Sequence, residues 1–157
     1  MADLKPPRVS GSERDSLHAL LQYQRDSLVR KITGVDTEAA RRSAVASGTT
    51  LLWLVKHLAR AEILWLVIRF GGLDADLPDD VVRSDDTVAS VIEGYRAASA
   101  RADAVALTAS LDDQCRNNPD DEPVNLRWVL AHMLEETARH AGHADILREL
   151  IDETTGR

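Results

Sequence analysis

The segment 125–149 concentrates the residues of this chain that can bind a metal. It reads NLRWVLAHMLEETARHAGHADILRE and contains three of the five histidines, His132, His140 and His143. Glu136 precedes His140 by four residues. Residues four apart lie one above the other on the same face of a helix. Glu136 and His140 can therefore hold one ion between them.

A third ligand is expected from His57, which lies in an earlier apolar segment. Metal sites in helical bundles are built from inward side chains on facing helices. Two histidines and one glutamate with an open fourth position form a known catalytic zinc arrangement. Our central hypothesis is a divalent metal bound by His57, Glu136 and His140. It requires the two segments to face each other across a bundle.

Simpler interpretations of the same residues stay open. A glutamate and a histidine four apart form a common surface pair, worth about 0.2–0.5 kcal/mol. A single histidine at the edge of an apolar face, such as His57, is more often a core histidine than a ligand. His143 could replace Glu136 or His140 as a ligand, because residues three apart also meet. His132 is interpreted as facing solvent.

The helical periodicity separates these side chains. With a step of about 100° per residue, Glu136 and His140 border the apolar face of their segment. His143 and His132 lie farther round, nearer the rim. A carboxylate at the border of a core is costly unless it is paired or bound to a metal. The periodicity therefore selects one glutamate and one histidine.

Other residues have structural interpretations. Glu62 is expected to form a salt bridge with an arginine or, less simply, to orient His57. Cys115 is expected to be an inert thiol, because a reactive cysteine needs a nearby base or cation. His18 is interpreted as structural or exposed, and the three tryptophans as core or interface anchors. Candidates for binding an anionic group of a substrate are Arg25, Arg127 and Arg148.

Four amphipathic segments position these side chains. None of them shows the alternating pattern of a strand. Ser12 and Asn125 are typical N-cap residues for the first and the last segment. Four long helices predict an all-α protein with a four-helix bundle in a single domain. Apolar residues recur at helical spacing over about residues 13–32, 49–70, 85–110 and 125–152.

The remaining segments connect or precede these helices. We assign residues 1–10 to an extended N-terminal arm and residues 11–157 to the bundle domain. Thr37 and Glu38 indicate a short helical turn. The polar connection 111–124 contains two prolines, and long loops of this kind are usually functional lids or disordered.

The composition excludes several classes of protein. The formal net charge of −7 argues against binding a nucleic-acid backbone. A single cysteine excludes an intramolecular disulfide. The N-terminus has no apolar signal-peptide region. The longest apolar stretch, 49–71, contains five charged or histidine side chains and is too polar to span a membrane. We expect a cytoplasmic protein.

Two segments carry a resemblance to a known family. The segments SGTTLLWLVKHLARAE and NLRWVLAHMLEETARHAGHADILRELID resemble the DinB-like superfamily of small bacterial proteins. The likeness runs from about Tyr23 to Thr155. It is strongest to the actinobacterial branch that includes the mycothiol-dependent maleylpyruvate isomerase and the mycothiol S-transferases.

The resemblance implies a fold and a set of ligands. The fold is a four-helix bundle in up-down-down-up order, often dimeric. The metal is bound by one residue of the second long helix and two of the fourth, here His57, Glu136 and His140. In much of the superfamily all three are histidines, whereas the mycothiol-dependent isomerase has a glutamate at the position of Glu136. His143 stands where many members carry a glutamine, which makes it a candidate to support a ligand.

The resemblance also implies an activity. It is a metal-dependent thiol S-transferase that conjugates a mycothiol-like low-molecular-weight thiol to an electrophile, with a role in detoxification. Zinc is the expected metal, with nickel or another divalent ion as alternatives. The expected partners are the small-molecule thiol and electrophile and a second copy in a homodimer, with no nucleic acid and no membrane. The alternatives are a metal-dependent hydrolase that activates water, or a non-catalytic dimeric binding bundle.

Overall fold

The computed structural model describes residues 4–118 and 122–155. Parts of three assignments lie outside the described residues: positions 1–3 of the arm, 119–121 of the long connection and 156–157 of the domain. The elements in chain order are α1 (Glu13–Ile32), α2 (Thr37–Arg41), α3 (Leu51–Glu62), η1 (Ile63–Phe70), α4 (Val88–Ala106) and α5 (Leu126–Asp152).

Three long helices begin at N-cap residues in the places that the sequence indicates. The hydroxyl of Ser12 accepts a hydrogen bond from the backbone N–H of Asp15, and the Asp15 carboxylate accepts one in return from the backbone N–H of Ser12. The side chains of Thr50 and Asn125 cap α3 and α5 by accepting from the backbone N–H groups of Trp53 and Trp128. Such a cap satisfies one of the four unpaired N–H groups of the first turn. The predicted beginnings of α1, α3 and α5 are confirmed.

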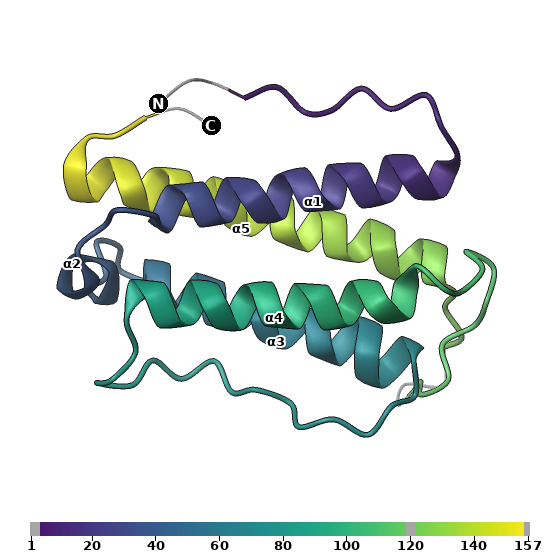
Figure 1. Cartoon of the computed structure of the whole chain (residues 1–157). Helices are drawn as coiled ribbons and strands as arrows, with labels where there is room; N and C mark the ends of the chain where they lie inside the picture. Colours follow the sequence, from purple (N-terminus) through teal and green to yellow (C-terminus); the bar gives the residue numbers. More distant parts are fainter. Residues whose placement is uncertain (1–3, 119–121, 156–157) are drawn as a thin grey trace.

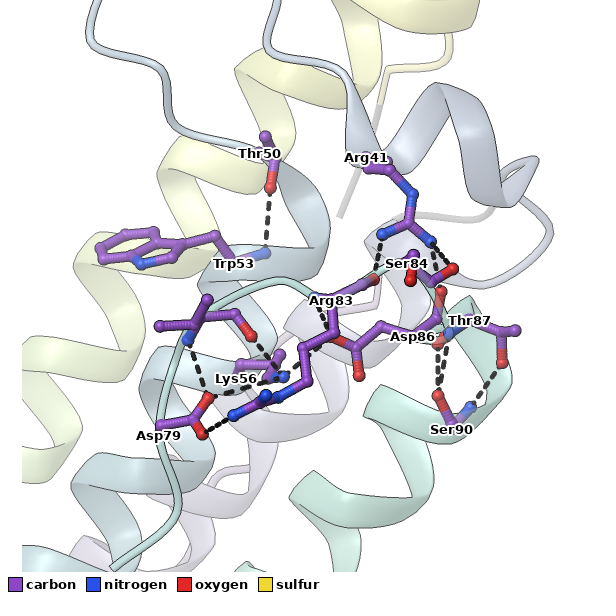
Figure 2. Close-up of polar contacts among 11 residues, drawn as sticks. Arg41, Thr50, Trp53, Lys56, Asp79, Arg83, Ser84, Asp86, Thr87 and Ser90 are labelled. Carbon is purple, nitrogen blue, oxygen red and sulfur yellow. Dashed lines mark hydrogen bonds and ion pairs between the residues drawn. The ribbon is translucent and has the colours of Figure 1, made fainter.

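The third predicted helix differs at both ends. The sequence predicts a helix over about residues 85–110, with Asp85 and Asp86 as possible caps by residue type, whereas α4 begins after the cap residue Thr87 and ends at Ala106. The Asp86 carboxylate instead accepts hydrogen bonds from Nζ of Lys56 at 2.8 Å and from the backbone N–H of Arg83 at 2.7 Å (Figure 2). Asp86 therefore fixes the preceding loop to α3 through Lys56, and Thr87 caps the helix.

The second predicted helix has the expected extent but changes its winding. α3 continues without a break into the π-helix η1, whose C-cap residue is Gly71. The N–H of Gly71 donates to the carbonyl of Leu66, five residues earlier, at 3.1 Å. A Cβ at position 71 would lie 2.7 Å from the carbonyl oxygen of Val67. Only glycine fits this tight end, and π-helical turns occur often at functional sites.

The helices form a bundle in up-down-down-up order (Figure 1). α1 packs beside α5 and runs in the same direction, whereas α3 and α4 run the other way. The long connection before α4 returns along the bundle, which makes the two middle helices parallel (Figure 1). The predicted all-α, single-domain, DinB-like bundle is confirmed. None of the described helices is long and apolar enough to cross a membrane.

A buried ion pair joins α1 to α3 inside the bundle. Arg25 is 2% exposed and Glu62 is fully buried. Nε and an Nη atom of Arg25 donate to the two carboxylate oxygens of Glu62, each at 2.7 Å. The other Nη atom donates to Asp103 of α4 at 2.9 Å. The predicted salt bridge of Glu62 with an arginine is confirmed. Burial lowers the pKa of Arg25, but Glu62 and Asp103 outweigh it and the pKa lies above its ordinary value.

Loss of the Glu62 carboxylate is expected to destabilise the bundle strongly. Glu62→Gln leaves the buried Arg25 guanidinium without its main counter-charge, which costs about 3–5 kcal/mol of unfolding free energy. Urea denaturation followed by circular dichroism measures this loss. The control is Glu93→Gln, an exposed position on α4, which should change stability by less than about 0.5 kcal/mol. Equal midpoints for the two variants would contradict this role.

Candidate metal centre

The three residues of the hypothesis lie together between α3 and α5. Oε1 of Glu136 lies 3.1 Å from Nε2 of His57 and 3.1 Å from Nε2 of His140. One ligand atom from each of the three residues falls within 4.8 Å of the others. α3 therefore faces α5, as the hypothesis requires. Metal binding by this cluster stays a prediction.

Trp53 forms one wall of the cluster. Its indole stacks on the imidazole of His57, with ring centroids 4.8 Å apart and planes 18° apart. It meets His140 edge-on, with centroids 6.2 Å apart. The interpretation of this tryptophan as a core or interface anchor missed its place in the site. The signal was its position four residues before His57, one turn along the same face.

Two further side chains touch the outer nitrogens of the histidines. Oδ2 of Asp80, in the loop before α4, lies 3.3 Å from Nδ1 of His57. Nδ1 of the exposed His143 lies 3.3 Å from Nδ1 of His140. His143 thus contacts the ring nitrogen of His140 that does not contact Glu136. His143 is therefore placed to support His140 and not to replace it as a ligand.

His132 belongs to a different cluster. Its ring stacks on Trp128, with centroids 5.0 Å apart, and meets Trp65 edge-on at 4.6 Å. The guanidinium of Arg69 lies 4.2 Å from the centre of a Trp65 ring. The side chain of His132 is 25% exposed, so the interpretation of a simply solvent-facing residue is wrong. The two aromatic partners cover it.

The three candidate arginines all bind groups of the protein itself. Arg25 is buried in its ion pair with Glu62. Arg127 donates to Glu13 and Asp112 on the surface. The remaining one, Arg148, donates to Asp152 and to the backbone carbonyls of Lys31 and Thr33. Their role in this structure is to join segments, and none of them is needed to explain the site.

Two other residues have partners in the tertiary structure. His18, interpreted as structural or exposed, lies 3.4 Å from a carboxylate oxygen of Asp103. Cys115 is buried, and burial raises the pKa of its thiol while Arg69 opposes that rise. A thiol with a raised pKa is a poor nucleophile, which agrees with the expected inert cysteine.

The surroundings of Glu136 and His140 shift their pKa values toward the protonation states in which these side chains bind metals. Partial burial raises the pKa of Glu136, but the contacts of its carboxylate with the rings of His57 and His140 outweigh that effect, so the pKa lies below its ordinary value. Burial lowers the pKa of His140, and the nearby Glu136 carboxylate opposes that change only in part. At neutral pH this favours an ionised carboxylate beside a neutral imidazole. Metals bind these forms.

The donor set fits a divalent transition metal. Imidazole nitrogen and carboxylate oxygen are the donors that zinc and its neighbours accept. The three donors converge from two helices, and the side chains of His57 and His140 are 27% and 12% exposed, so the cluster is reached from solvent. The contact of Asp80 with His57 matches the common pattern in which a ligand histidine donates its other N–H to a carboxylate.

An apolar cavity of about 380 Å³ lies beside the cluster. His143 is part of its lining and its ring also contacts that of His140, so the cavity is linked to one of the candidate ligands through His143. Among the residues that the structure describes, the cavity lining contains no aspartate, glutamate, lysine or arginine. The lining residues come from the connection before α3 and from α5: Val45, Ser47, Thr49, His143, Ile146 and Leu147.

Comparison with protein families identifies a match over most of the chain. A family model described as mycothiol-S-transferase matches residues 16–153, which is nearly the whole chain. A comparison with curated proteins finds no match.

Solved structures share the fold at low sequence identity. A conserved protein from Enterococcus faecalis aligns with a TM-score of 0.66 and 15% identity, over 92% of this chain and 100% of its own. A DinB-like protein from Bacillus cereus ATCC 10987 aligns with a TM-score of 0.65 and 13% identity, over 85% of this chain and 89% of its own. At such identities the likeness establishes the bundle architecture alone.

Proposed function

The chain belongs to the mycothiol S-transferase family, and we propose that it transfers a mycothiol-like thiol to an electrophilic small molecule at a metal bound by His57, Glu136 and His140. The observation that carries the proposal is the convergence of these three donors from two helices. Zinc is the metal we propose, because two imidazoles and a carboxylate are a donor set it commonly accepts. Detoxification of electrophiles is the proposed role.

The proposed reaction forms a carbon–sulfur bond and breaks two bonds, the S–H bond of the thiol and the bond from carbon to the leaving group. The thiol sulfur bonds to the electrophilic carbon, the leaving group departs with the electron pair of its bond, and the thiol proton passes to solvent. When bound, the metal supplies a Lewis acid that keeps a coordinated thiol ionised at neutral pH. The chain needs no cysteine of its own for this reaction, which agrees with the buried Cys115.

Residues of this chain supply the donor set, cover one of the ligand rings and bind the electrophile. Glu136 supplies the one negative charge of the donor set, beside two imidazoles. Trp53 packs on His57 and keeps water away from one face of that ring. We assign the electrophile to the apolar cavity next to His143, because a lining without charged side chains suits an uncharged apolar group.

The first expected result concerns metal content. After reconstitution with zinc and dialysis, the protein should retain about one zinc per chain. His57→Ala and His140→Ala should each weaken zinc affinity by more than about 100-fold, because losing a ligand costs more than losing a residue that supports one. Competition with a chromophoric chelator measures this. His132→Ala, a histidine of α5 outside the cluster, is the matched control, and equal losses in all three variants would refute the ligand set.

The second expected result separates transfer from hydrolysis. With zinc and mycothiol, the protein should conjugate monochlorobimane, an uncharged alkyl chloride whose thioether fluoresces. His57→Ala should lose most of this rate because it lacks a ligand of the Lewis acid, and His132→Ala should keep it. Zinc-dependent hydrolysis of p-nitrophenyl acetate without any thiol, and no conjugation, would instead indicate a hydrolase.

The third expected result tests the cavity. Ile146→Glu places a carboxylate in its apolar lining and should raise KM for monochlorobimane about tenfold or more, because it weakens binding by 1–3 kcal/mol. The values of kcat and of zinc affinity should stay unchanged. Leu150→Glu is the matched control, since both side chains are 57% exposed on α5 and only Ile146 lines the cavity. Equal KM values in the two variants would place the electrophile elsewhere.

A further inference from the structure

The loop 73–87 is unusually long for a connection without helix or strand. It runs from the end of η1 back along the bundle to the beginning of α4 (Figure 1). Connections of about 15 residues that lack secondary structure are uncommon in compact domains and are often functional. Its course is determined by side chains of α2 and α3 that bind its backbone.

Side chains of α3 hold the middle of this loop. Arg60 donates to the carbonyl of Pro78 at 2.8 Å, and Nζ of Lys56 donates to the carbonyl of Val81 at 2.6 Å. Nζ of Lys56 also binds the carboxylate of Asp86 (Figure 2). Loop residues with rising numbers thus meet α3 residues with falling numbers, so the loop lies antiparallel to the helix.

A second anchor holds the far end. The guanidinium of Arg41, at the end of α2, donates to the backbone carbonyls of Arg83 and Ser84 and to that of Asp86 at 2.6 Å (Figure 2). Because three separate arginine and lysine side chains bind its carbonyls, the loop has a defined register against α3. A loop that was held only at its two ends would have no defined register against the helix.

This register places Asp80 opposite His57. Asp80 lies between the two backbone anchors at Pro78 and Val81, and His57 lies between the anchoring side chains on α3. The resulting distance from Oδ2 of Asp80 to Nδ1 of His57 is 3.3 Å. The neighbouring Asp79 is engaged elsewhere, since its carboxylate pairs with Arg83 and accepts from the N–H of Val81 at 3.1 Å (Figure 2).

We propose that Asp80 is a positioning residue that accepts the Nδ1–H of His57, competes with Glu136 for the single ring proton, and so favours an unprotonated Nε2 on the side of Glu136 and His140. A neutral imidazole carries its proton on one nitrogen only, and the hydrogen bond made by that nitrogen decides which one it is. The Lys56 and Arg60 anchors hold the carboxylate at the required place. The part of this inference that concerns metal rests on the proposed function.

Metal affinity gives the first test. Asp80→Ala should weaken zinc affinity about 10- to 100-fold, measured by chelator competition. Asp80→Asn keeps an oxygen that accepts the N–H and should recover part of this loss. Asp79→Ala removes the same charge one residue away and should change the affinity by less than about threefold. Equal effects of Asp79→Ala and Asp80→Ala would overturn the proposal in favour of a general charge effect.

The anchor residue Lys56 gives a test of opposite sign. Lys56→Met removes a positive charge near the site, which by electrostatics alone should tighten the binding of a cation. It also releases the backbone at Val81 and should let the Asp80 carboxylate move away from His57. The proposal therefore expects weaker zinc binding in Lys56→Met. Tighter binding would contradict the positioning role of the loop.

A measurement without metal separates this inference from the proposed function. In the metal-free protein at about pH 8, where an ordinary histidine is neutral, nitrogen-15 NMR of the His57 ring reports which nitrogen carries the proton. Asp80→Ala should shift the population toward the Nε2–H form, and Asp79→Ala should leave it unchanged. Absence of a shift would overturn the role of Asp80. A clear shift in a protein that binds no zinc would support Asp80 and refute the proposed function.

Discussion

The buried ion pair between Arg25 and Glu62 determines how α3 is turned about its own axis. A carboxylate is costly to bury without a counter-charge, and Arg25 of α1 supplies the one that Glu62 contacts, so this face of the helix points at α1. His57 precedes Glu62 by five residues, which turns it about 140° around the helix. That rotation directs its ring away from the ion pair and toward Glu136 and His140 of α5. The candidate site therefore depends on a contact made elsewhere in the core.

Three carboxylates near α3 have the same chemistry and different surroundings. Glu62 is enclosed and bound by a guanidinium. Glu136 stands between two imidazoles with part of its surface exposed. Asp80 meets the far nitrogen of one of those imidazoles from a loop. Because arginine has no lone pair to give a metal, only the carboxylate between histidines belongs to a donor set.

The fold could be predicted from the sequence almost completely, and the site only in part. Apolar residues at helical spacing and the caps Ser12 and Asn125 placed the long helices, because both signals act within one or two turns of chain. The beginning of α4 was misplaced because Asp86 is a good cap by type but is used by Lys56, 30 residues away. His132 was misinterpreted for a similar reason, since its partner Trp65 lies on another helix.

The sequence by itself determined that Glu136 and His140 share a face of one helix, because a helix brings residues four apart together whatever surrounds it. Only the tertiary structure decided that His57 completes this pair, since the rotation and register of α3 against α5 depend on packing of the whole core. Only the tertiary structure brought Asp80 to His57, because an irregular loop has no repeat from which positions follow. Its place depends on Lys56, Arg60 and Arg41, which bind the loop from other segments.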